Sequence, residues 1–172
     1  MLYKVLKDFL LKKQIKKVAS QNLKAVSGES VATIGVLIDA VSFKDKDIFL
    51  EKLKKKSPVE FKIQLLVFRK KVKKTETVHY PYFMASDVGL DGAFSKGEVE
   101  HFVNFPFDVL ISYYDNQNSS LEWVTVLSKA KFKVGLHSIH TSLNHFTINT
   151  FVENYEEFIL ILFQYLKILK KI

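Results

Sequence analysis

Four side chains suited to acid–base chemistry follow three apolar runs of the sequence. Asp39 lies at the end of the run 31–40 and Tyr113 at the end of the run 107–114, which Asp115 follows directly. His137 follows the run 131–136. If these runs are parallel strands, their carboxyl ends meet at one edge of a sheet, where open α/β sheets bind ligands. The spacing predicts a crevice in which a carboxylate pair and a histidine are available for acid–base work.

A purely structural interpretation of the same residues also stays open. Asp39 would then cap the following helix or turn, because short acidic side chains accept hydrogen bonds from nearby main-chain N–H groups. Tyr113 would pack in the core with its ring buried. Single residues of these types serve such roles more often than they serve catalysis.

The glycine-rich segment 92–97 has the G-x-x-x-x-G spacing of a Walker A phosphate loop. However, Glu98 and Val99 stand where that loop needs Lys and Ser or Thr to reach the phosphates and the magnesium ion. The first apolar run is followed by Asp39-Ala40-Val41, with no glycine for a dinucleotide-binding turn. We therefore expect neither ATP nor NAD as a ligand, and no cofactor.

The same segment partly matches a calcium-binding loop. Positions 1, 5, 6, 9 and 12 of an EF-hand loop carry Asp87, Asp91, Gly92, Ser95 and Glu98. Gly89 at position 3 removes one oxygen ligand, and the extended pattern of residues 80–83 replaces the entering helix. A calcium site and an acidic turn without metal remain the two alternatives.

Three histidines with the spacing H-x-x-H-x-x-x-x-H form the other candidate metal set. His137, His140 and His145 could chelate zinc only if the loop folded their rings together. The chain has no cysteine and no H-E-x-x-H helix. We therefore expect polar surface histidines and no metal site.

A lysine-rich helix is predicted over residues 2–24. Lys12, Lys13, Lys16 and Lys17 fall at i, i+1, i+4 and i+5, on one side of such a helix, while Leu11, Ile15 and Val18 lie on another side. Residues 1–24 hold seven lysines against one acid, Asp8. Such a face predicts anion binding, and the alternative is a solubilising surface.

The elements that would position these side chains alternate between strands and helices. Strands are predicted at 31–40, 61–69, 78–82, 107–114, 131–136 and 146–149, and helices at 44–56, 98–103, 119–129 and 153–170. This order predicts a Rossmann-like, three-layer α/β domain with a mostly parallel sheet over residues 29–172. Residues 1–28 form the extra basic helix and its linker.

Two packing expectations follow from the apolar runs. Continuous runs indicate strands buried on both faces, so Leu37, Leu66, Leu110 and Val134 should be buried. The last helix has no polar break over residues 158–163. It should therefore be covered on more than one side, either by the basic helix or by a second subunit in a homodimer.

Composition and charge set the class of the chain. With 172 residues, 48% hydrophobic residues and no cysteine, it fits one globular domain rather than a disordered or disulfide-stapled chain. Residues 1–76 carry 19 Lys and Arg against 8 Asp and Glu, whereas residues 77–172 carry 7 against 10. No signal peptide or membrane span is found, so a cytoplasmic location is expected.

Two resemblances to known proteins accompany these patterns. Ala130, Lys131, Val134 and Gly135, within residues 107–136, resemble a segment of heptosyltransferase-type glycosyltransferases. Those enzymes bind nucleotide-sugar chiefly through a second α/β domain, for which this chain has no room. The whole sequence is similar to uncharacterised flavobacterial-type (Bacteroidota) proteins with a basic N-terminal helix, which implies a single Rossmann-like domain and no specific activity.

The sequence favours a non-enzymatic binding module that docks its basic helix on an anionic macromolecule, RNA or a ribonucleoprotein. The first alternative is a small-ligand or degenerate glycosyltransferase-like domain that uses the predicted crevice. The second is a protein of the membrane surface, because basic amphipathic helices also lie on anionic bilayers. Against that alternative, the helix has no clean, wide apolar face in the sequence pattern.

Overall fold

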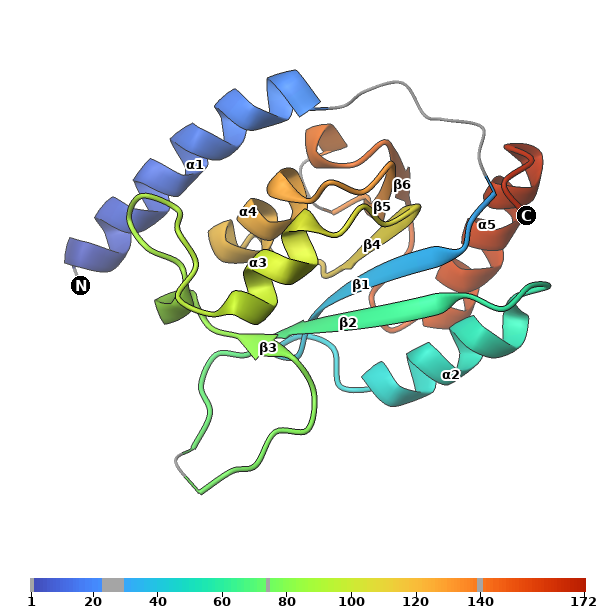
Figure 1. Ribbon diagram of the computed structural model, residues 1–172, viewed down its shortest axis with the longest axis horizontal. Coiled ribbons are helices and arrows are strands. Elements are labelled where there is room, and N and C mark those ends of the chain that lie inside the picture. The colour runs from blue at the N-terminus through green and yellow to red at the C-terminus, as the bar shows by residue number, and fades with distance from the viewer. Residues whose placement is uncertain (1, 23–29, 74, 139–140) are drawn as a thin grey trace.

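Four apolar runs form the centre of a parallel sheet in the computed structural model, which describes residues 2–22, 30–73, 75–138 and 141–172. The central strands are β1 (Thr33–Asp39), β2 (Lys62–Phe68), β4 (Val109–Tyr113) and β5 (Phe132–Leu136). Short strands β3 (Tyr82–Phe83) and β6 (Phe146–Ile148) form the two edges. The order is β3-β2-β1-β4-β5-β6, and every pair is parallel (Figure 1). The predicted Rossmann-like α/β class is confirmed.

Helices cover both faces of this sheet (Figure 1). One face packs against α2 (Lys46–Lys56) and α5 (Tyr155–Ile168), and the other against α1 (Leu2–Asn22), α3 (Gly97–Asn104) and α4 (Ser119–Leu127). Two short 3₁₀ turns, Ala85–Asp87 and Thr141–Leu143, lie in the connections. Within the described ranges, no helix combines the length and the apolar content that a membrane crossing requires.

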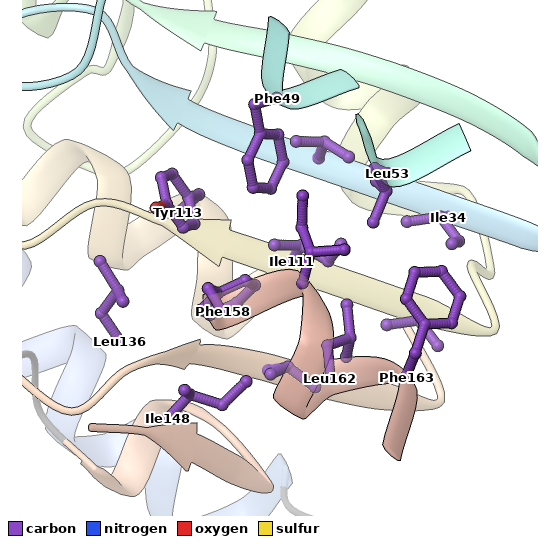
Figure 2. Packing of buried hydrophobic residues seen from close by; sticks show 14 of the residues in the cluster. Ile34, Phe49, Leu53, Ile111, Tyr113, Leu136, Ile148, Phe158, Leu162 and Phe163 are labelled. Carbon is purple, nitrogen blue, oxygen red and sulfur yellow. The ribbon is translucent and has the colours of Figure 1, made fainter. Parts of the chain in front are cut away.

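Each face of the sheet has its own apolar cluster. Leu37, Leu66 and Leu110 belong to the cluster under α1, α3 and α4, while Val134 belongs to the cluster under α2 and α5. All four side chains are fully buried, as predicted. Figure 2 shows the second cluster, in which side chains of α2 and α5 pack against those of the central strands.

The predicted strand 78–82 is wrong over residues 78–81, because β3 begins only after Pro81. Only Tyr82 and Phe83 pair with β2. Pro81 has no N–H to donate, but its carbonyl accepts a hydrogen bond from the main chain of Val67 at 3.0 Å. The proline therefore ends the loop after β2 at the sheet edge.

The basic helix α1 packs on α4. Leu11 and Ile15 are buried in the cluster that α4 also contributes to. Ser119 donates its hydroxyl to the Asp8 carboxylate at 2.7 Å, and the Lys7 ammonium donates to the carbonyl of Ala85. The predicted boundary between residues 28 and 29, with most of the linker, lies outside the described residues.

The expectation that α1 covers the last helix is therefore wrong. α1 lies on the opposite face of the sheet from α5, as Figure 1 shows. The second cover of α5 is α2, to which Lys52 of α2 and Glu156 of α5 add an ion pair at 2.8 Å. The homodimer through the last helix stays a prediction.

Candidate functional site

The predicted crevice lies where the strand order changes direction, between β1 and β4. Asp39 ends β1 and is only 3% exposed. Its Oδ1 accepts a hydrogen bond from the Val41 N–H at 2.8 Å, which is the turn-capping role considered from the sequence. Burial raises the pKa of Asp39, and the negative charge of Asp115 raises it further. The charges of these two carboxylates therefore interact.

Tyr113 faces the core instead of the crevice. Its side chain is fully buried, with its ring 4.5 Å from that of Phe49 and 4.9 Å from that of Phe158 between centroids (Figure 2). Its hydroxyl donates to the carbonyl of Val152 at 2.7 Å. Burial raises the pKa of this hydroxyl above its ordinary value, so it stays protonated. Tyr113 therefore has a packing role between the sheet and the helices α2 and α5.

His137 is exposed at the end of β5. Its Nδ1 lies 3.3 Å from the hydroxyl of Thr147 on β6, which is paired in register with Gly135. In the part of the chain that the structure describes, no hydrogen bond connects His137 with Asp39 or Asp115. Asp115 thus interacts electrostatically with Asp39 and with Tyr113, while the ring of His137 lies beside Thr147.

The carboxylates of the calcium-like loop are engaged within the protein. Asp87 accepts from the Met84 N–H at 2.8 Å and pairs with the Lys96 ammonium at 3.4 Å. Asp91 accepts from the Ala93 N–H at 3.0 Å. Backbone geometry gives Gly92 a φ of 82°, so a left-handed residue closes the turn. These contacts support the acidic-turn interpretation.

The histidine set does not assemble among the described residues. His145 accepts the N–H of Lys133 through its Nδ1 at 3.0 Å, and His140 lies outside the described residues. Over the described ranges, no group of three His, Cys, Asp or Glu side chains is placed to hold a metal ion.

The solvent-facing side of α1 presents more than lysines. Lys12, Lys13, Lys16 and Lys17 are all exposed, as predicted from their spacing. The turns before them expose large apolar side chains, with Leu2 84%, Val5 63% and Phe9 64% accessible. We call the outer face of α1 the set Leu2, Val5, Leu6, Phe9, Lys12, Lys13, Lys16 and Lys17. The helical spacing of Leu2, Val5, Leu6 and Phe9 could have revealed this apolar half, because i, i+3, i+4 and i+7 share one side.

A second concave region, which the sequence analysis missed, lies beside the predicted crevice. Its volume is about 420 Å³, and it opens beyond the carboxyl ends of β1 and β2. We call it the strand-end pocket; its polar lining is Lys44, Lys46, Arg69, Lys70, Lys71 and Tyr80. The signal was present in the sequence, since basic residues follow both strands.

Comparison with known proteins identifies a family but no activity. The sequence model of a family of unknown function, DUF6913, matches residues 7–169. The match covers nearly the whole chain, so the protein belongs to this family. No curated protein matches the chain.

Proposed function

We propose that this member of the DUF6913 family is a non-enzymatic binding module that docks on an anionic surface through the outer face of α1. Among the partners considered from the sequence, a bilayer with anionic lipids is better supported than RNA. The observation that carries this preference is that one helix face combines exposed lysines with exposed large apolar side chains.

The apolar half of the outer face distinguishes the two partners. RNA phosphates attract lysines, and bases stack on aromatic rings such as Phe9. RNA has no apolar region in which Leu2, Val5 and Leu6 could be buried, and their exposure to water is unfavourable. An interfacial helix instead places such side chains about 5–10 Å into the headgroup and acyl boundary.

Both halves of the face then contribute to binding. Burying a Leu, Val or Phe side chain completely is worth about 1.5–3 kcal/mol, so even partial burial of four of them is substantial. Each lysine near an anionic leaflet adds about 1 kcal/mol. Neither half alone would hold a protein of this size firmly.

The attachment of α1 to the domain supports this role. Leu11 and Ile15 on its inner side are buried, and Asp8 is bonded to Ser119 at the start of α4. The outer face can therefore contact a bilayer while α1 stays packed on the rest of the domain. A surface held in this way loses little conformational entropy on binding.

Co-sedimentation with lipid vesicles tests the proposal. The protein should bind vesicles of phosphatidylcholine mixed with about a third of phosphatidylserine, and binding should weaken as salt screens the lysines. Changing Lys12, Lys13, Lys16 and Lys17 to Glu should abolish binding. The double change Val5→Ser and Phe9→Ser should weaken binding about tenfold or more, since it removes about 2 kcal/mol or more of burial.

Two matched controls accompany these variants. Changing the exposed Lys54, Lys55, Lys56 and Lys62 to Glu alters net charge equally but should leave vesicle binding nearly intact. Asp39→Asn should have no effect.

If the lysine variant lost RNA binding while the Val5 and Phe9 changes had no effect, RNA would be the partner. If neither vesicles nor RNA bound, the lysines would be a solubilising face and the proposal would be wrong.

The glycosyltransferase-like alternative has less support from its own residues. Lys131 pairs with Asp108 at 3.0 Å, and Ala130 is buried beside Val103 and its neighbours in the first apolar cluster. A Cβ on Gly135 would lie 2.5 Å from the amide of Asn144, so packing accounts for that glycine. A small-ligand role is supported by the strand-end pocket rather than by these positions.

A further inference from the structure

We infer that the strand-end pocket binds a small phosphorylated ligand of about mononucleotide size. The inference is independent of the proposed docking of α1, because the pocket lies at the carboxyl ends of β1 and β2 and shares no residue with the outer face of that helix. It rests on the position of the pocket, its charge, the way its cations are held, and its size.

The pocket lies at the carboxyl ends of parallel strands, one strand away from the point between β1 and β4 where the strand order changes direction. Asp39 and Phe68 are paired in register at the ends of β1 and β2, so the segments after both strands start side by side. The Ala40 N–H donates to the carbonyl of Phe68 at 3.0 Å, and the Arg69 N–H to that of Phe83 at 2.9 Å. The main chain on both sides of the pocket is therefore fixed to the sheet. Ligands of such sheets bind beyond these carboxyl ends.

The charge of the pocket selects an anion. Five cations line it, and no carboxylate is among its described lining residues. Asp47 neutralises Lys46 at 2.6 Å, and Glu76 neutralises Arg69 at 2.6 Å. Lys70 and Lys71, in contrast, have no ion-pair partner in the described part of the chain. A positive excess remains, which attracts an anion into the pocket.

The cations are also oriented, which separates this pocket from an ordinary basic surface. Tyr80 lies between two of them: its hydroxyl is 3.3 Å from the Arg69 Nη1, and the Lys46 ammonium is 4.7 Å from the centre of its ring. The side chains of Lys46 and Arg69 are only 16% and 21% exposed. Lys44 donates to the carbonyl of Ala40 at 3.0 Å. These contacts hold Lys46 and Arg69 at the wall of the pocket, where both already pair with carboxylates. The charge that meets phosphate oxygens is then that of Lys70 and Lys71.

The size of the pocket excludes a bare ion as its best ligand. Its volume of about 420 Å³ falls within the range of about 300–1,000 Å³ for small-molecule sites. Phe43 and Val41 add apolar wall next to the cations. A phosphate group attached to a sugar or nucleoside would satisfy both parts of the lining.

Isothermal titration calorimetry on the full chain tests the inference, with adenosine monophosphate and glucose phosphate as probes. Each should bind about tenfold or more tightly than adenosine or glucose, which corresponds to about 1.4 kcal/mol. Changing Lys70 and Lys71 to Gln should weaken binding of the phosphorylated probes about tenfold, because both side chains are exposed lining cations. Circular dichroism should show an unchanged fold, since neither residue is in the core.

The matched control changes another adjacent pair, Lys54 and Lys55 of α2, to Gln, and it should leave binding unchanged. Changing Lys12, Lys13, Lys16 and Lys17 to Glu should also leave it unchanged. Three results would overturn the inference: no binding of phosphorylated probes at millimolar concentration, equal binding of citrate and the phosphorylated probes, or equal losses in the Lys70–Lys71 and Lys54–Lys55 variants.

Discussion

Among single residues, Lys133 is the most unusual charged group in the described structure. It is 2% exposed and donates to the carbonyls of Thr125 and Val126, at 2.8 and 3.1 Å, in the last turn of α4. It therefore caps the negative end of that helix. Burial lowers the pKa of Lys133 to about 8.

This lowered pKa predicts a pH-dependent stability. Between pH 8 and its ordinary pKa of 10.5, Lys133 is more protonated in the unfolded chain than in the folded one. The free energy of unfolding should therefore rise with pH, by about 1 kcal/mol from pH 7 to 9 through this residue alone. Urea unfolding of the wild type and of Lys133→Met at both pH values measures the effect. An equal pH dependence in the two proteins would contradict it.

Asp39 shows how a predicted site residue can have a structural role as well. Its carboxylate accepts the Val41 N–H, so the side chain shapes the turn that begins the strand-end pocket. Its neighbour Ala40 lines that pocket and Asp39 itself does not. The sequence analysis pointed to the carboxyl end of β1, and the pocket that we propose as a ligand site there is lined by cations that come later in the chain.

The strands were predictable from sequence because burial on both faces leaves continuous apolar runs. The four central strands lie inside the predicted ranges, and the order of strands and helices is as predicted. The strand-end pocket was not predictable in the same way. Its cations come from residues 44–46 and 69–71, and they meet only because β1 and β2 pair in parallel register.

The sequence analysis did not predict that α1 packs on α4, for a different reason. The helix has apolar side chains on its inner side, such as Leu11 and Ile15, and on its outer side, such as Leu2 and Phe9. A helical pattern with apolar residues on two sides does not reveal which side is buried. Only the complementary surface of α4, which begins at Ser119, decides it.

The inner side of α1 should matter for stability as a core does. Leu11→Ala should lower the free energy of unfolding by about 2–5 kcal/mol, since it removes a fully buried side chain and leaves a cavity between α1 and the domain. Phe9→Ala should change it by less than about 0.5 kcal/mol, because Phe9 is 64% exposed. Urea unfolding measures both. Similar losses of unfolding free energy for the two variants would show that α1 does not bury the side described here.

At the scale of the whole molecule, both apolar clusters share one sheet, so the chain should unfold in a single transition. Trp123 is the single tryptophan, is 6% exposed, and donates its indole N–H to the carbonyl of Gly92 at 2.8 Å. Its fluorescence reports on the cluster that holds α1. The fluorescence and circular dichroism transitions in urea should coincide. A separate dichroism transition would show that α1 unfolds alone.

The attachment of α1 to α4 also has a consequence for synthesis on the ribosome. Ser119 is 111 residues downstream of Asp8, the residue it bonds. At translation rates of about 5–20 residues per second, that interval lasts on the order of 10 s. Throughout it, Leu11 and Ile15 lack the surface of α4 on which they finally pack. We therefore expect the exposed lysines of α1 to reduce association between unfinished chains by charge repulsion before α4 emerges.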